Sequence, residues 1–97
     1  MKSWERRALN PNTPTTKDNE TVRTSSSKHP KTGKEILFPM IRYLDGKLVK
    51  YGSEKEAKAE AIRRKDFIEF DSPDDATKYS KNLSNRIDIV RRKAKNP

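Results

Sequence analysis

Few residues of this chain have the chemistry for catalysis or metal binding. It has one histidine, His29, and no cysteine, so a zinc site would lack its usual nitrogen and sulfur ligands. His29 precedes Pro30 in a polar, lysine-rich turn, where we expect an exposed loop histidine and not a general base. The serines at 25–27 have no base pattern around them, and the three glycines form no phosphate-binding loop. The residue types therefore predict no metal and no cofactor.

Asp74 and Asp75 resemble the paired carboxylates of an acid–base site. They follow Ser72 and Pro73, a serine and proline pair that is typical of a helix start. Acids in a first helical turn are stabilised by the unpaired N–H groups and the helix dipole. Helix capping accounts for both aspartates, so we expect that the protein is not an enzyme.

Positive charge is the strongest chemical signal in the sequence. The net charge is +9, and residues 35–90 are balanced, whereas residues 1–34 carry five excess positive charges and residues 91–97 add four. Basic ends attract a polyanion or an acidic protein surface over a long range. The candidate polyanion-binding residues are Arg6, Arg7, Arg91, Arg92, Lys93 and Lys95.

Residues 1–20 predict an extended N-terminal arm, because they contain two prolines and no periodic apolar pattern. Trp4 and Leu9 are its large apolar side chains. Tryptophan is enriched at interface hot spots, so one interpretation makes Trp4 and Leu9 anchors in a partner protein. The other interpretation is that Trp4 packs on its own domain, and the sequence leaves both open.

Strands are predicted between residues 21 and 51. Residues 21–25 have β-branched content, and residues 35–44 are the most hydrophobic stretch of the chain. Pro39 has no N–H to donate, so the strand that contains it is an edge strand or is bent there. Asp45-Gly46 is a strong hairpin signal.

Two helices are expected after this hairpin. Ser53 and Glu56 match a capping box, and that helix should end near Arg64-Lys65. Residues 66–70 alternate in polarity and form either a strand or an extended linker. The last helix carries one apolar stripe at helical spacing, formed by Ala76, Tyr79, Leu83, Ile87 and Val90.

Together these signals predict the α+β class: a small antiparallel β-meander of two to three strands packed against two α-helices, with an extended N-terminal arm. We expect an arm at 1–20, an α+β module at 21–90 and a basic C-terminal tail at 91–97. Since 30% of residues are hydrophobic and 38% are charged, the core should be small and the stability modest. No apolar run approaches the length of a membrane span, so we expect a soluble protein with no membrane partner.

Four segments of the sequence follow one another in a distinctive order. They are Phe38-Pro39-Met40-Ile41, Asp45-Gly46, Ser53-Glu54-Lys55-Glu56-Ala57 and Phe70-Asp71-Ser72-Pro73-Asp74-Asp75-Ala76, the last continued by Tyr79 and Leu83. This order resembles a small module that recurs in virion and structural proteins of tailed bacteriophages. The resemblance covers roughly residues 22 to 83, about two thirds of the chain. Where the module usually has a Thr-Gly turn, Arg64-Lys65-Asp66 stands here.

The resemblance implies a non-enzymatic structural component of a bacteriophage virion, in the tail, near the portal or associated with the capsid. Such a protein acts through protein–protein contacts with other virion proteins in a symmetric, multi-copy assembly. Its location would be the virion, and the host cytoplasm before assembly. A small basic nucleic-acid-binding or regulatory protein is the alternative, because the basic tails also suit contact with nucleic acid.

Overall fold

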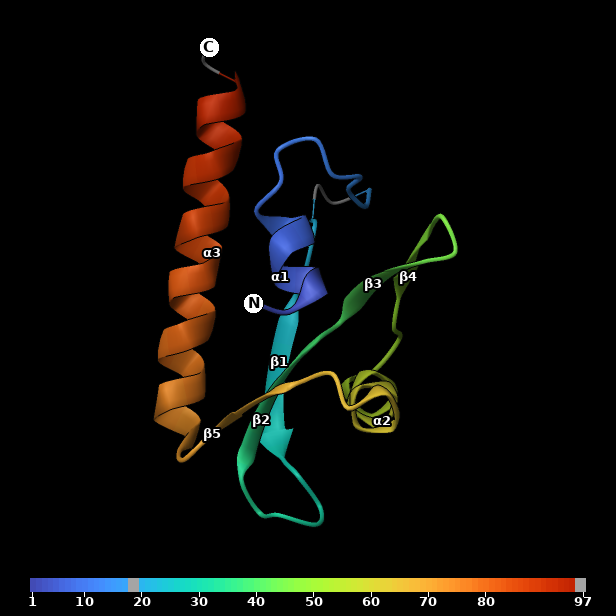
Figure 1. Ribbon diagram of the computed structural model, residues 1–97, viewed down its shortest axis with the longest axis vertical. Helices are drawn as coiled ribbons and strands as arrows, with labels where there is room; N and C mark the ends of the chain where they lie inside the picture. Colours follow the sequence, from blue (N-terminus) through green and yellow to red (C-terminus); the bar gives the residue numbers. More distant parts are fainter. Residues whose placement is uncertain (18–19, 96–97) are drawn as a thin grey trace.

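Three helices and five strands form the described residues, which are 1–17 and 20–95, with side chains described as far as Lys93 (Figure 1). The computed structural model has them in the order α1 (Ser3–Ala8), β1 (Thr24–Lys28), β2 (Glu35–Pro39), β3 (Ile41–Leu44), β4 (Lys47–Lys50), α2 (Glu54–Arg64), β5 (Ile68–Phe70) and α3 (Pro73–Lys95). The strands form two small antiparallel sheets. This arrangement confirms the α+β class.

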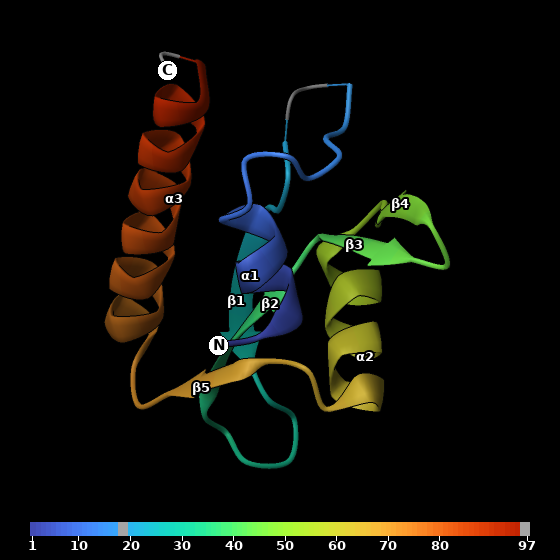
Figure 2. The same cartoon turned by 45° about the horizontal axis from the view of Figure 1, so that its top comes forward.

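The larger sheet has the strand order β1-β2-β5, and β2 is its buried central strand. Ser26 of β1 pairs with Leu37, and Glu69 of β5 pairs with Ile36. Figures 1 and 2 show α2 on one side of this sheet and α3 on the other. Because both faces are covered, β2 has the continuous hydrophobic run of a fully buried strand.

One face of the sheet packs against α1 and α3 through a core of Trp4, Ala8, Leu37, Leu83 and Ile87. The predicted apolar stripe of α3 therefore faces the core. Ser72 caps this helix, since its Oγ accepts a hydrogen bond from the Asp75 N–H at 3.2 Å. The helix continues to Lys95, so most of the expected basic tail is helical as far as the structure describes it.

The opposite face packs against α2, where Ala57 and Ala61 meet Ile36 and Phe38. Alanines at these positions let the helix approach the sheet closely. Ser53 caps α2 as predicted, because its Oγ accepts a hydrogen bond from the Glu56 N–H at 3.2 Å.

Pro39 bends the chain and is not part of an edge strand. The stretch predicted as one strand divides into β2, which ends at Pro39, and β3, which begins at Ile41 in the second sheet. Strands β3 and β4 pair with each other around Asp45 and Gly46, whose φ angles are +51° and +79°. Two positive φ values are typical of the type I′ hairpin turn. The hairpin prediction is confirmed, but the strands do not form one continuous meander.

The prediction of an extended arm is wrong for residues 3–8, which form α1. Glu5 closes the first turn by accepting the Lys2 N–H at 2.8 Å. Trp4 and Ala8 are four residues apart, so they share a helix face, and Trp4 is only 3% exposed. Leu9 packs against the same core. Trp4 thus packs on its own domain, which was the second of the two interpretations.

His29 is buried, so the expectation of an exposed loop histidine is also wrong. The turn after β1 folds back, and the His29 Nδ1 accepts the Lys31 N–H at 3.0 Å. Its ring lies 5.4 Å from that of Phe67, centroid to centroid. A hydrogen bond to the backbone and an aromatic neighbour give His29 a structural role that the sequence pattern did not indicate.

Candidate anion-binding pocket

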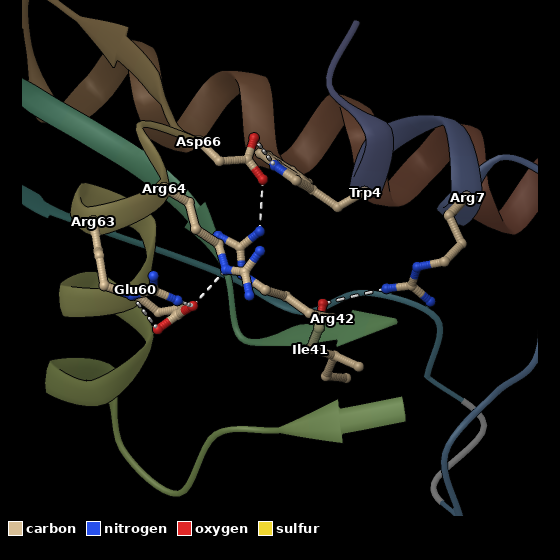
Figure 3. Close-up of polar contacts among 8 residues, drawn as sticks. All are labelled: Trp4, Arg7, Ile41, Arg42, Glu60, Arg63, Arg64 and Asp66. Atoms are coloured by element: carbon tan, nitrogen blue, oxygen red, sulfur yellow. Dashed lines mark hydrogen bonds and ion pairs between the residues drawn. The ribbon is translucent and has the colours of Figure 1, made fainter. Parts of the chain in front are cut away.

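The end of α2 places an aspartate against the N-terminal helix. Lys65 adopts a left-handed conformation with φ +52°, and its N–H donates to the Ile62 carbonyl at 3.1 Å. The Asp66 N–H donates to the Ala61 carbonyl at 2.9 Å, which completes a Schellman-type helix end. This turn directs the Asp66 side chain toward α1 and β3 (Figure 3).

The Asp66 carboxylate joins α1 to β3. Its Oδ1 accepts the Trp4 Nε1–H at 3.2 Å, and its Oδ2 accepts from Arg42 Nη1 at 2.6 Å (Figure 3). Arg42 is only 6% exposed, so this ion pair lies largely away from water. Removing one partner of such a pair leaves an uncompensated buried charge, which is strongly destabilising. Asp66 therefore fixes the orientation of the Arg42 guanidinium.

The other edge of that guanidinium has no partner. Arg42 Nε and Nη2 are buried and make no hydrogen bond within the described part of the chain. Their N–H groups point the same way from one side of the planar group, which is the edge that binds carboxylates and phosphates in a bidentate manner. A buried donor without an acceptor costs free energy, so such groups call for a physical explanation.

Arg7 of α1 lines the same pocket as Arg42 and is also incompletely paired. Its Nη2 donates to the Ile41 carbonyl at 3.2 Å, whereas its Nη1 is buried without a partner among the described residues (Figure 3). Burial lowers the pKa of the Arg7 guanidinium, because the charged form loses part of its hydration. A bound anion would compensate this cost.

These groups line a pocket of about 300 Å³ that we call the arginine pocket. Arg64, at the end of α2, also lines it and pairs with Glu60, which accepts from Arg63 as well (Figure 3). Those two arginines lower the pKa of Glu60 to about 2 through their hydrogen bonds. The full lining is Ser3, Trp4, Arg7, Arg42, Tyr43, Leu44, Arg64 and Asp66.

Two of the three arginines in the pocket pair with an acid, although Arg64 shares Glu60 with Arg63. Arg42 pairs with Asp66 and Arg64 with Glu60, and no described carboxylate pairs with Arg7. Counted with Arg63, four arginines and two acids lie at the pocket, so positive charge is left over. A larger pocket of about 560 Å³ beside the start of α2 contains none of the unpartnered buried nitrogens found among the described residues.

The sequence-predicted site residues lie in different places. Arg7 lines the arginine pocket, and Trp4 contributes to its wall from the core, whereas Arg6 is exposed on α1. Near the C-terminal end of α3, Arg91 is half-buried and Arg92 and Lys93 are exposed. That end of α3 extends past α1 in both views, so the basic residues do not gather at one site (Figures 1 and 2). Lys95 belongs to α3, but its side chain lies outside the described residues.

Sequence reasoning missed Arg42, Arg64 and Asp66. One signal pointed to Arg42: it is a charged residue inside the most hydrophobic stretch of the chain, between Ile41 and Tyr43. A buried arginine needs a partner, so its position alone indicated an acid or a ligand nearby. Arg64 and Asp66 gave no such signal, because basic and acidic residues are common at helix ends.

Comparison of the chain with family models, with curated proteins and with solved structures gives no match. Within residues 1–17 and 20–95, no group of three or more histidine or acidic side chains is arranged to hold a metal ion. None of the helices in that part of the chain is long and apolar enough to cross a membrane.

Proposed function

We propose that this chain is a non-enzymatic structural component of a bacteriophage particle, in the tail, near the portal or associated with the capsid. The observation that carries the proposal is that the residues of the bacteriophage-like pattern shape one folded body. Asp45 and Gly46 form the hairpin turn, Ser53 caps α2, and Ser72 caps α3. A module defined by these turns and caps would present the same framework to its neighbours in each copy.

Contact with other virion proteins would be made by the folded body. α1 belongs to the core, so residues 3–8 are not available to clasp a neighbouring subunit. Besides Met1, the large apolar side chains that are exposed in the described part of the chain are Tyr43 on β3 and Ile89 on α3. Exposed apolar groups on different elements suit a protein with more than one neighbour in a symmetric, multi-copy assembly. Before assembly the protein would reside in the host cytoplasm.

The test is incorporation into particles of the virus that encodes the chain. An epitope tag after Pro97 leaves the core untouched, and tagged particles are banded by density, treated with nuclease and washed in high salt. We expect the tagged chain to remain with the particles at a constant copy number. A chain that is absent from the banded particles would contradict the proposal.

A second candidate function, nucleic-acid binding, is favoured by the exposed basic residues of α3. Arg92 and Lys93 lie near its C-terminal end, and Lys78, Lys81 and Arg86 are exposed earlier along the helix. Phosphate contacts make affinity fall steeply with salt, by a slope of about 0.9 per contact on a double-logarithmic plot. If Arg92 and Lys93 both contact phosphates, raising the salt from 50 to 200 mM weakens the DNA affinity of the wild type by a factor about 12 times larger than that of the variant with glutamine at both positions.

Fluorescence anisotropy with a short DNA duplex measures this salt dependence. The control is the pair Lys31→Gln and Lys47→Gln, which removes the same charge from exposed turn and hairpin positions. Equal salt slopes for the α3 variant and the control would count against a nucleic-acid interface on α3.

A further inference from the structure

We propose that the arginine pocket binds the carboxylate of an acidic side chain of a partner protein. The free Nε and Nη2 edge of Arg42 would hold the two carboxylate oxygens, and Arg7 would supply the compensating charge. This inference names the chemistry of one contact in the proposed protein–protein function and therefore rests on it.

The geometry of Arg42 supports bidentate binding. One side of its guanidinium is fixed by Asp66 through Nη1, and the two remaining donors face away from that bond. Asp66 is itself held by the Trp4 indole. The free edge is thus oriented before a ligand arrives, so little side-chain entropy is lost on binding.

The charge and size of the pocket favour a single carboxylate over a nucleic-acid phosphate. Arg7 has no described acid and Glu60 is shared by Arg63 and Arg64, so the pocket has an excess of positive charge that a monovalent carboxylate reduces. A phosphodiester is also monovalent, but nucleic-acid sites depend on a row of cations along the backbone. The remaining wall includes Trp4, Tyr43 and Leu44, which leave room of about 300 Å³ for a short side chain.

Entry of the carboxylate requires a small movement, because the unpaired nitrogens of Arg7 and Arg42 have almost no surface open to water. Arg64 is the exposed arginine of the pocket, with 38% of its side chain accessible. Exposed ion pairs contribute little free energy, so Arg64 can leave Glu60 at small cost. Glu60 keeps Arg63 as its partner when this happens.

The experiment is an NMR titration of the full chain with sodium acetate, following the Nε–H signals of arginine and the indole N–H of Trp4. Sodium chloride at the same ionic strength corrects for screening, and dimethyl phosphate represents the phosphodiester. We expect acetate to give saturating shifts at Arg42 and Trp4. Shifts no larger than those with chloride would overturn the proposal, and saturation by dimethyl phosphate alone would assign the pocket to a phosphodiester instead.

Two variants separate binding from folding. Arg42→Lys keeps the charge beside Asp66 but removes the planar edge, so we expect acetate binding to weaken roughly tenfold. Arg7→Gln should weaken it by a similar factor, whereas Arg6→Gln, an equal charge loss on the exposed side of α1, should change it less than about twofold. Thermal melting and Trp4 fluorescence establish that each variant is folded.

A folded Arg42→Lys variant that binds acetate as tightly as the wild type would refute the bidentate contact. The titration uses the isolated chain, so it can fail while the chain still enters particles, and the reverse can also occur. The outcome for the pocket and the outcome for the virion function are therefore distinguishable.

Discussion

Replacing Trp4 with alanine tests whether α1 is part of the folded core or an arm attached to it. Trp4 is 3% exposed and packs with Ala8, Leu37, Leu83 and Ile87. It is the only tryptophan of the chain, and its indole also donates to Asp66. Truncation would remove the largest apolar group between α1 and α3 and would leave one oxygen of a partly buried carboxylate without its donor.

The expected loss of stability is large for a chain of this size. A buried tryptophan replaced by alanine costs about 3–5 kcal/mol. Small domains have a total free energy of unfolding of about 5–15 kcal/mol, so this change removes a substantial fraction of it. At about 4–8 °C per kcal/mol, the melting temperature should fall by roughly 12–40 °C.

Circular dichroism during thermal and urea unfolding measures this effect without relying on the fluorophore that the variant lacks. Trp4→Phe keeps most of the packing and loses only the indole donor, so its cost should be smaller than that of Trp4→Ala. Tyr43→Ala removes an aromatic ring that is 45% exposed and should change stability by at most about 0.5 kcal/mol. If Trp4→Ala unfolds at the same temperature as Tyr43→Ala, α1 does not contribute to the core and the reasoning is refuted.

Three further predictions concern a buried hydrogen bond and two turns. Tyr79→Phe should cost about 1–3 kcal/mol, because Glu5, which is 1% exposed, loses the hydroxyl donor of Tyr79. The hydrogen bond to Glu5, together with burial, raises the pKa of Tyr79 from 10.0 to about 12. Its contribution to stability is therefore complete below pH 10 and is lost as the pH rises toward about 12, so alkaline unfolding should shift less with pH in Tyr79→Phe than in the wild type. Lys65→Gly should stabilise the chain by about 0.5–1 kcal/mol in urea unfolding, since glycine adopts the left-handed conformation without steric cost; a loss of stability would contradict this. Gly46→Ala should destabilise it by about 1 kcal/mol in the same assay, because its φ of +79° disfavours a β-carbon, and an unchanged midpoint would argue against the type I′ turn.

Much of the fold followed from local signals in the sequence. The caps at Ser53 and Ser72 and the turn at Asp45-Gly46 act within a few residues, and the structure confirms each of them. The apolar stripe of α3 is also local, because its period is visible along one helix. The sequence of residues 66–70 is compatible with a strand or a linker, and pairing with β2 makes residues 68–70 a strand.

The errors lie where contacts distant in sequence decide the structure. The sequence of the first residues is typical of a polar arm, yet α1 is stable because Trp4 and Ala8 pack against side chains of β2 and α3. A six-residue helix has little stability on its own, so tertiary packing must hold it in place. The lysines around His29 predict a solvent-exposed side chain, but the ring of Phe67, far along the chain, packs against the His29 ring. No local pattern contains this information.

The arginine pocket is the strongest case of the same limit. Its polar groups come from α1, β3 and the end of α2, and each looks like an ordinary charged residue in its own segment. Only in the folded chain does Arg42 donate to Asp66 through Nη1, while its Nε and Nη2 are buried without a hydrogen-bond partner among the described residues. If stability alone had selected this residue, an apolar side chain at position 42 would avoid the cost of desolvating a cation. A buried cation with a free binding edge beside a second, unbalanced arginine is better explained by a ligand that completes the set, and the acetate titration addresses that explanation directly.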